Sequence, residues 1–195
     1  PGSPSAIESE NSGAVSFIDD FEAGQTGIDI RNRAAWVLAS TPQGQPTEWP
    51  EGDLVDDITY GFNRAKFAWY NIDPLFSDDK ASTPEHIINN KSIQENLFQR
   101  TVLQSEIYPQ KSLAMGEPPA LQTFDLAYFP SERGPYNYDT SGEGGISAGI
   151  NHLDGTLIDP ETRWGGIMRK IDYVDFASQN IEFIEFWVMD PFPTD

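Results

Sequence analysis

The stretch FIDDFEAG, residues 17–24, places the carboxylates of Asp19, Asp20 and Glu22 within an apolar run. In an extended strand alternate side chains face opposite sides, so Asp20 and Glu22 share one side. Two carboxylates at this spacing suit a hard cation such as Ca²⁺, which binds oxygen ligands. Without a cation they repel each other and need an arginine nearby. Two hypotheses therefore stay open: a structural Ca²⁺, or ion pairs and hydrogen bonds at a strand end.

Other catalytic chemistry has little support in the sequence. The chain has no cysteine, and its two histidines, His86 and His152, lie far apart, which disfavours zinc sites and thiol catalysis. There is no G-x-S-x-G motif, and the glycine-rich residues 142–149 lack the lysine of a phosphate-binding loop. A glycosidase needs two carboxylates, and 31 acidic residues always offer a pair, so this signal is uninformative. We predict a chain that is not an enzyme.

The charge of the chain restricts its partners. Its 195 residues carry a formal charge of −19, from 31 acidic and 12 basic side chains. Such a chain repels phosphate backbones and anionic lipid headgroups, so we expect no nucleic-acid partner. No apolar run approaches the ~20 residues that a membrane-spanning helix needs, so we expect no direct membrane insertion of this segment.

The apolar pattern predicts a mainly β fold. Residues 56–73 and 121–130 alternate between apolar and polar positions, and a change of parity in the first of them predicts a bulge or turn near Asn63. We expect one or two short helices, one of them with Pro84 at its first helical position. The alternation from Thr101 to Ile107 predicts a strand that runs into Pro109. With 15 prolines and 16 glycines the loops are long, which is typical of a β-sandwich.

We expect residues 1–13 to be a flexible linker and residues 14–195 to form a single β-sandwich domain of jelly-roll type. Its last strand is predicted within NIEFIEFWVMDPF, residues 180–192, which is apolar on both faces and therefore suits a central position. Glu182 and Glu185 interrupt this run and need partners when buried. The arginines that could pair with them are Arg64, Arg133, Arg163 and Arg169.

Aromatic residues in loops predict a contact surface. Trp49 lies among prolines, and Tyr136 and Tyr138 belong to the loop SERGPYNYD, residues 131–139. Arg133 either anchors this surface or pairs internally with an acid such as Asp139 or Glu185, and both arrangements stay open. Exposed aromatic rings also bind sugars, so a carbohydrate-binding module at the cell surface is the alternative function. The predicted interface residues are Arg133, Tyr136, Tyr138 and Trp49.

Several strings together resemble one family in their order and spacing. They are FIDDFEAGQTGIDI, WVLASTP, NRAKFAWYNIDPLF, PEHI, DLAYFPSERGPYNYD, RWGGIMRKID and NIEFIEFWVMDPF. They resemble the SprA/Sov family, the outer-membrane translocon of type IX secretion and gliding motility. The resemblance covers residues 14–192, a small part of that family's very long chain. It implies a soluble, noncatalytic domain of a large transmembrane β-barrel that exports folded proteins.

The resemblance also implies where the domain lies and what it contacts. It places the domain with the outer membrane at the cell surface, at the extracellular mouth of the barrel, with a periplasmic position as the alternative. The implied partners are the rest of the translocon, its sister domains and exported cargo, and the implied role is structural or gating.

A second resemblance concerns the opening strand. DDFE, residues 19–22, is similar to the start of galactose-binding-like domains. Those domains often hold a structural Ca²⁺ with carboxylates of their first and last strands. The matching metal ligands here would be Asp20 or Glu22 together with Asp190.

Overall fold

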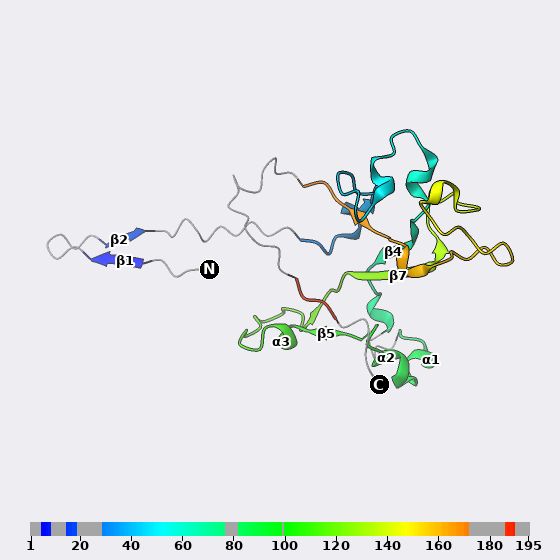
Figure 1. Cartoon of the computed structure of the whole chain (residues 1–195). Helices are drawn as coiled ribbons and strands as arrows, with labels where there is room; N and C mark the ends of the chain where they lie inside the picture. Colours follow the sequence, from blue (N-terminus) through cyan, green and yellow to red (C-terminus); the bar gives the residue numbers. More distant parts are fainter. Residues whose placement is uncertain are drawn as a thin grey trace. The chain divides into compact units, whose positions relative to one another are not determined.

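The chain divides into two units, residues 1–30 and residues 31–195. In the first unit β1 (Ser5–Glu8) and β2 (Val15–Ile18) form an antiparallel pair with Ser5 opposite Ile18 (Figure 1). β1 lies within the range for which a linker is predicted. The computed structural model describes residues 5–8, 15–18, 29–76, 82–98, 100–171 and 186–189.

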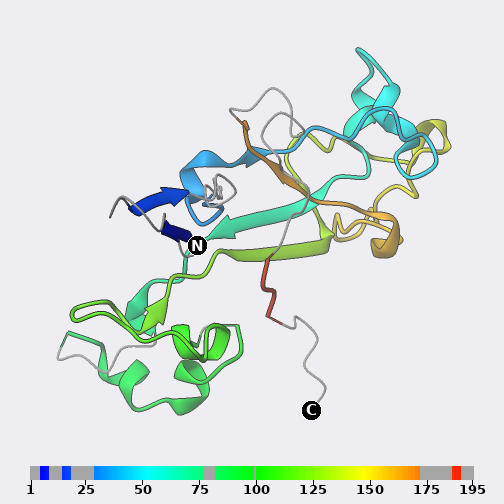
Figure 2. The same cartoon turned by 90° about the vertical axis from the view of Figure 1, so that its left-hand side faces the viewer.

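The longest strand pair of the second unit is antiparallel and joins β4 (Ala65–Tyr70) to β7 (Asp125–Arg133). Figure 2 shows these two strands side by side. Phe67 lies opposite Tyr128, with their ring centroids 6.2 Å apart. The alternation that predicts both strands places bulky side chains on a pleated surface, where they pack across the pair.

A change of structure before β4 confirms the predicted turn near Asn63. Residues 62–63 form a turn, and the residues before them form the 3₁₀-helix η4 (Ile58–Gly61) rather than a strand. Asp57 caps this helix, because its Oδ1 accepts hydrogen bonds from the backbone N–H and the hydroxyl of Thr59 at 2.9 and 2.8 Å. This local cap outweighs the alternation of the apolar residues.

A second set of pairings lies beside β4. β3 (Val37–Leu38) pairs antiparallel with β8 (Ile167–Met168), and Trp164 forms a parallel bridge with Arg64. The backbone N–H of Ala65 donates to the carbonyl of Trp164 at 2.8 Å. The residues just before β8 therefore extend the β4–β7 pair by a further edge.

The remaining elements are short. β5 (Val102–Leu103) pairs antiparallel with β6 (Ala120–Leu121). The helices are α1 (Glu85–Ile88), α2 (Lys91–Gln94), α3 (Gln104–Ile107) and the 3₁₀-helices η2 (Arg33–Ala35), η3 (Pro50–Asp53), η5 (Pro74–Phe76), η6 (Glu143–Gly145) and η7 (Pro160–Thr162). The described chain thus consists of short antiparallel strand pairs with few, short helices, in agreement with the mainly β class.

Two local predictions are wrong. Pro84 precedes α1 instead of starting it, since the helix begins at Glu85. Residues 104–107, predicted as part of a strand, form α3 instead. The side chain of Glu106 accepts a hydrogen bond from the backbone N–H of Leu103 at 2.9 Å, and this reciprocal contact stabilises a helical turn.

The predicted last strand is wrong where the structure describes it. Residues 186–189 carry no strand, and Phe186, Trp187 and Val188 are 68–75% exposed. A strand covered on both faces needs neighbouring strands, and none of the described residues pairs with this segment. The rest of NIEFIEFWVMDPF, including Glu182 and Glu185, lies outside the described residues.

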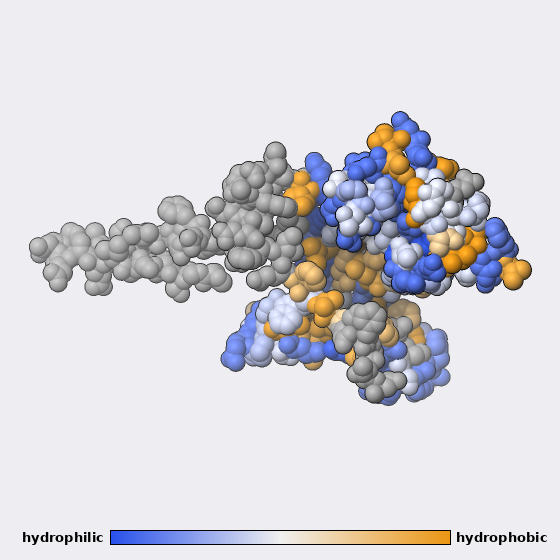
Figure 3. Space-filling view, viewed as in Figure 1, coloured by the Kyte–Doolittle hydropathy of each residue, from blue (hydrophilic) through white to orange (hydrophobic). Residues whose placement is uncertain are grey.

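The buried interior beside β4 is strongly polar. Phe62 and Leu157 are buried apolar side chains there, but many neighbours carry polar groups. Large hydrophobic side chains also reach the surface, where Figure 3 shows them intermixed with hydrophilic residues. Among the described residues of the whole second unit, those that are buried and polar or charged are Thr41, Glu51, Asn63, Arg64, Thr83, Gln94, Gln104, Asn137, Asp139 and Arg163.

Candidate functional site

A pocket of about 270 Å³ is lined by Ile58, Tyr60, Tyr136 and Tyr138. η4 supplies the first two of these residues, and the loop after β7 supplies the other two. Ile58, Tyr136 and Tyr138 are 60%, 65% and 58% exposed, so their apolar surfaces are open to a partner. The tertiary structure thus brings two predicted interface tyrosines together with two residues that the sequence did not single out.

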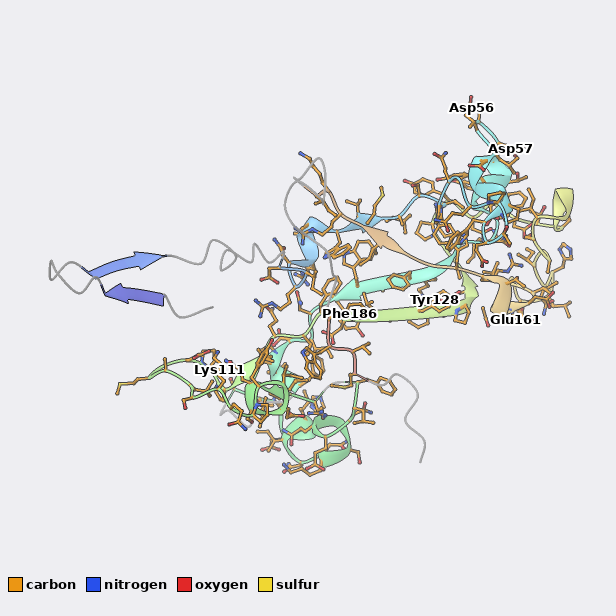
Figure 4. The ribbon with its side chains drawn as sticks, turned by 60° about the vertical axis from the view of Figure 1, so that its left-hand side comes forward. Asp56, Asp57, Lys111, Tyr128, Glu161 and Phe186 are labelled. Carbon is orange, nitrogen blue, oxygen red and sulfur yellow. The ribbon has the colours of Figure 1, made fainter. Side chains whose placement is uncertain are left out.

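Acidic side chains lie beside the pocket, on the η4 side. Asp56 and Asp57 precede Ile58, and Figure 4 shows both at the outer end of this segment. Hydrogen bonds from the backbone N–H and the hydroxyl of Thr59 lower the pKa of Asp57. Its carboxylate is therefore ionised at neutral pH, although it also caps η4.

Two glycines lie where the loop after β7 contacts neighbouring backbone. There is no room for a larger side chain at either position. A Cβ on Gly134 would lie 2.3 Å from the carbonyl oxygen of Ala65, and a Cβ on Gly61 would lie 2.6 Å from that of Tyr136. Tyr136 itself has φ of 61°, in the left-handed region that non-glycine residues rarely adopt. The contacts around this residue therefore hold it in a costly conformation.

Asn137 attaches the loop to the residues before β4. Its Nδ2 donates to the backbone carbonyls of Phe62 and Arg64, both at 2.8 Å, and its Oδ1 accepts from the N–H of Asp139 at 3.0 Å. The side chain of Arg133 donates to the carbonyl of Asp139 at 2.8 Å. Arg133 is an exposed residue and its acceptor is a backbone oxygen rather than the predicted carboxylate, so its role as an interface anchor stays a prediction.

Arg64 is 1% exposed and contacts Tyr60 of the pocket. It donates to the carbonyls of Pro135 and Ala39 at 3.1 and 3.2 Å, and to the hydroxyl oxygen of Tyr60 at 3.3 Å. Its guanidinium also lies 5.6 Å from the ring centroid of Tyr60 and 5.2 Å from that of Trp164. Because the oxygen of Tyr60 accepts from a cation, the hydroxyl proton is left to donate elsewhere.

Arg163 forms the centre of the buried network. Its guanidinium donates at 2.8–3.0 Å to the backbone carbonyls of Phe62, Gly149 and Ile158. Its Nη1 lies 3.8 Å from Oδ2 of Asp139, and both side chains are fully buried. Burial lowers the pKa of Arg163, while the charge of Asp139 opposes that shift. The pair therefore needs its many hydrogen bonds to offset the loss of water.

Asp139 in turn organises the glycine-rich loop that follows it. Its carboxylate accepts from the backbone N–H of Gly142 at 3.1 Å and from the hydroxyl of Ser147. The hydroxyl oxygen of Ser147 accepts from the N–H of Gly149 at 3.1 Å. Residues 142–149 thus fold around the buried carboxylate of Asp139.

Glu51 and Asn63 complete the network. Asn63 donates to Oε1 of Glu51 at 3.1 Å and to the carbonyl of Ile146 at 2.9 Å, and its Oδ1 accepts from Arg163 at 3.3 Å. Glu51 is 1% exposed, and among the described residues its Oε2 has no hydrogen-bond partner. Sequence reasoning missed Glu51, Asn63 and Asn137 because single polar residues beside turns usually face water.

The other predicted site residues do not join the pocket. Trp49 is half-buried just before η3, and its backbone N–H donates to the carbonyl of Gln45 at 2.9 Å. Asp20, Glu22 and Asp190 lie outside the described residues, so the predicted Ca²⁺ site stays a prediction. Within the part of the chain that the structure describes, no group of three or more acidic or histidine side chains is placed to hold a metal.

No family model matches the chain, and neither does any curated protein. Among the described helices, none has both the length and the apolar character needed to cross a membrane.

Proposed function

We propose that this chain is a noncatalytic contact domain of the type IX secretion translocon in the outer membrane. In this role it contacts the rest of the translocon, its sister domains or exported cargo, and either braces the pore or gates it. The strings that resemble the SprA/Sov family support the proposal because they supply several residues of the candidate site and of the network around it. NRAK contributes Arg64, RGPYNYD contributes the tyrosine loop, and RWGG contributes Arg163.

The main observation behind the proposal is that the buried side chains of the network donate hydrogen bonds to backbone carbonyls. Arg163, Arg64 and Asn137 donate to six different backbone carbonyls, and in this way they join segments that are distant in sequence. Such groups position a loop rather than react with a substrate. The loop so held presents Tyr136 and Tyr138 at the surface, and tyrosine is enriched where proteins contact one another.

The finer fold and the metal belong to the same proposal. We propose that the short strand pairs are parts of one jelly-roll sandwich spanning residues 14–195, with a structural Ca²⁺ held by Asp20, Glu22 and Asp190. Calorimetric titration of metal-stripped protein with Ca²⁺ tests the metal. The proposal expects heat of binding and a higher melting temperature, because a ligand that binds only the folded state stabilises it. Absence of both would contradict the Ca²⁺ site.

A carbohydrate-binding domain at the cell surface is the second candidate function. The tyrosine rings at one pocket favour it, since aromatic faces stack on sugar rings. Titration with soluble oligosaccharides separates the two candidates. Saturable sugar binding that is lost on Tyr138→Ala would favour the carbohydrate function.

Export by the parent translocon tests the proposed function directly. Deleting residues 14–195 from the parent chain is expected to reduce export, and undiminished export would contradict the proposal. A sharper variant combines Tyr136→Ser and Tyr138→Ser, with Tyr108→Ser as the matched control, since Tyr108 is half exposed but lies outside the pocket. The parent protein's abundance is measured alongside, so that lost export is not confused with lost protein.

The side of the membrane is tested with a cysteine placed at the pocket. Since the chain contains no cysteine, Tyr136→Cys creates one labelling site within this segment. Labelling on intact cells by an impermeant thiol reagent is expected from the proposed extracellular position. Labelling only after the outer membrane is opened would place the domain in the periplasm.

A further inference from the structure

We propose that the tyrosine pocket binds an extended, proline-containing segment of a partner protein, with a basic residue of that segment directed at Asp56 and Asp57. This inference rests on the proposed function and deepens it, because it names the chemistry of the contact. Three observations support it: the residues that line the pocket, the hydroxyl of Tyr60, and the negative charge of Asp56 and Asp57 beside the pocket.

The lining of the pocket favours a peptide over a sugar. Beside the aliphatic Ile58, the pocket side chains are three tyrosines, whose rings are apolar and whose hydroxyls are single polar points. A sugar ring carries hydroxyls around its whole edge, and each one that is buried without a partner is costly. Prolines present apolar rings at regular intervals in a preformed helix without internal hydrogen bonds, and grooves lined by aromatic side chains bind them.

The hydroxyl of Tyr60 supplies the polar contact that such a segment needs. Its oxygen already accepts from Arg64, and so the proton is available to an acceptor on the other side. The positive charge of Arg64 strengthens Tyr60 as a donor. An extended proline-rich segment exposes backbone carbonyls as acceptors and has few N–H groups, which matches a site that offers a donor.

The charge beside the pocket selects the flanking residue. Asp57 is ionised and exposed next to Ile58, and Asp56 adjoins it. The chain as a whole carries −19 charges, so a basic segment is attracted from a distance and an acidic one is repelled. A lysine or arginine next to the prolines therefore complements this side of the pocket.

The pocket is also held in shape before any partner binds. Tyr136 keeps its left-handed backbone because Asn137 ties the loop to Phe62 and Arg64. A site fixed in advance loses little conformational freedom on binding, which favours affinity. The strained backbone at Tyr136 is consistent with a functional surface.

The test uses the purified 195-residue chain and a labelled oligoproline peptide flanked by arginine, with binding measured by fluorescence anisotropy. We expect saturable binding that weakens at high salt. Tyr138→Ala is expected to weaken it about tenfold or more, as removal of a central aromatic anchor does. Tyr136→Gly is expected to do the same without unfolding the loop, since glycine accepts φ of 61°. Tyr108→Ala is the control and leaves binding unchanged.

The charge is tested separately. Asp57→Asn removes the negative charge and keeps a side chain that caps helices well, so η4 is retained. It is expected to weaken binding of the arginine-flanked peptide and to reduce the salt dependence. A glutamate-flanked oligoproline is expected to bind more weakly than the arginine-flanked one to the unaltered chain.

Three outcomes overturn the inference: no binding of the oligoproline peptide, binding that the pocket variants leave unchanged, or binding of a cello- or chito-oligosaccharide at the pocket in its place. Its failure is distinguishable from failure of the proposed function. If deletion of residues 14–195 impairs export but the peptide does not bind, only the proposed peptide binding is contradicted. If the peptide binds as expected but the deletion leaves export undiminished, only the translocon role is contradicted.

Discussion

Two charged regions of this chain differ sharply in what surrounds them. Around Arg163 the side chains of the arginine and of Asp139 are fully buried, with the ion-pair atoms 3.8 Å apart. Between α3 and β6, Lys111 and Glu117 form a closer pair at 2.5 Å, but they are 44% and 28% exposed. Distance alone would rank the second pair higher. Breaking the buried pair is nevertheless expected to cost more stability. Solvent screens the exposed pair, whereas a buried charge that loses its partner is strongly unfavourable.

The two regions also differ in reach. Arg163 joins the carbonyls of Phe62, Gly149 and Ile158, which come from separate segments. Lys111 contacts Glu117 and Gln104 within one short stretch of chain. The buried network therefore positions the tyrosine pocket, while the exposed pair organises only its own loop. Four predictions test this contrast, in order of expected effect.

Arg163→Met is expected to destabilise the chain most, by about 3–5 kcal/mol, because it leaves the carboxylate of Asp139 buried without its cation. It also removes the hydrogen bonds from Arg163 to the carbonyl of Ile158, and one of two donors to each of the carbonyls of Phe62 and Gly149. Urea denaturation measures the loss of the free energy of unfolding. Arg169→Met, at an arginine that belongs to a less buried segment, is the comparison. An Arg163→Met chain as stable as the original would contradict the central role of the network.

Asn137→Ala is expected to cost about 1–3 kcal/mol, since the carbonyls of Phe62 and Arg64 each lose one of two donors and the buried N–H of Asp139 loses its acceptor. The control is Asn90→Ala, at an exposed position after α1. The same variant is expected to weaken oligoproline binding, because the loop that carries Tyr136 loses its attachment. A stability change no larger than that of the control would show that the loop is held by other contacts.

Tyr136→Gly and Tyr138→Gly are expected to change stability in opposite directions. At Tyr136 the left-handed φ costs a non-glycine residue about 1–2 kcal/mol, so glycine relieves strain there. Tyr138 is not among the described residues with positive φ, so glycine there only adds freedom to the unfolded chain. Melting temperatures of the two variants, compared with the original, measure the difference. Two shifts in the same direction would count against backbone strain at Tyr136.

Lys111→Met is expected to have the smallest effect on stability at neutral pH, because the pair is exposed. Hydrogen bonds from Lys111, from the N–H of Ala114 and from Gln104 lower the pKa of Glu117 from 4.5 to about 2. Since the folded-state pKa is depressed, this carboxylate stabilises the fold fully above pH 4.5 and loses that contribution as the pH falls toward 2. Carboxyl NMR titration is expected to show the pKa of Glu117 rising toward 4.5 in the variant. An unchanged pKa would show that Lys111 is not the main cause.

Local patterns in the sequence predicted part of this structure. The parity change near Asn63 predicted a turn, and the alternation in residues 121–130 predicted β7. The predicted exposure of Tyr136 and Tyr138 is confirmed, because a loop rich in Gly and Pro keeps such rings at the surface. The apolar alternation gave a wrong prediction where a polar side chain accepts a hydrogen bond from the backbone and stabilises a helical turn. Asp57 does so at η4 and Glu106 at α3.

The sequence by itself determined the mainly β character, the acidic charge and the presence of aromatic residues in loops. These properties follow from composition and from short-range periodicity. The tertiary structure alone decided that Tyr60 joins Tyr136 and Tyr138, and that Arg163 meets Asp139 in the interior. No local pattern encodes either meeting, because each depends on backbone carbonyls and side chains from segments that approach one another only when the chain folds.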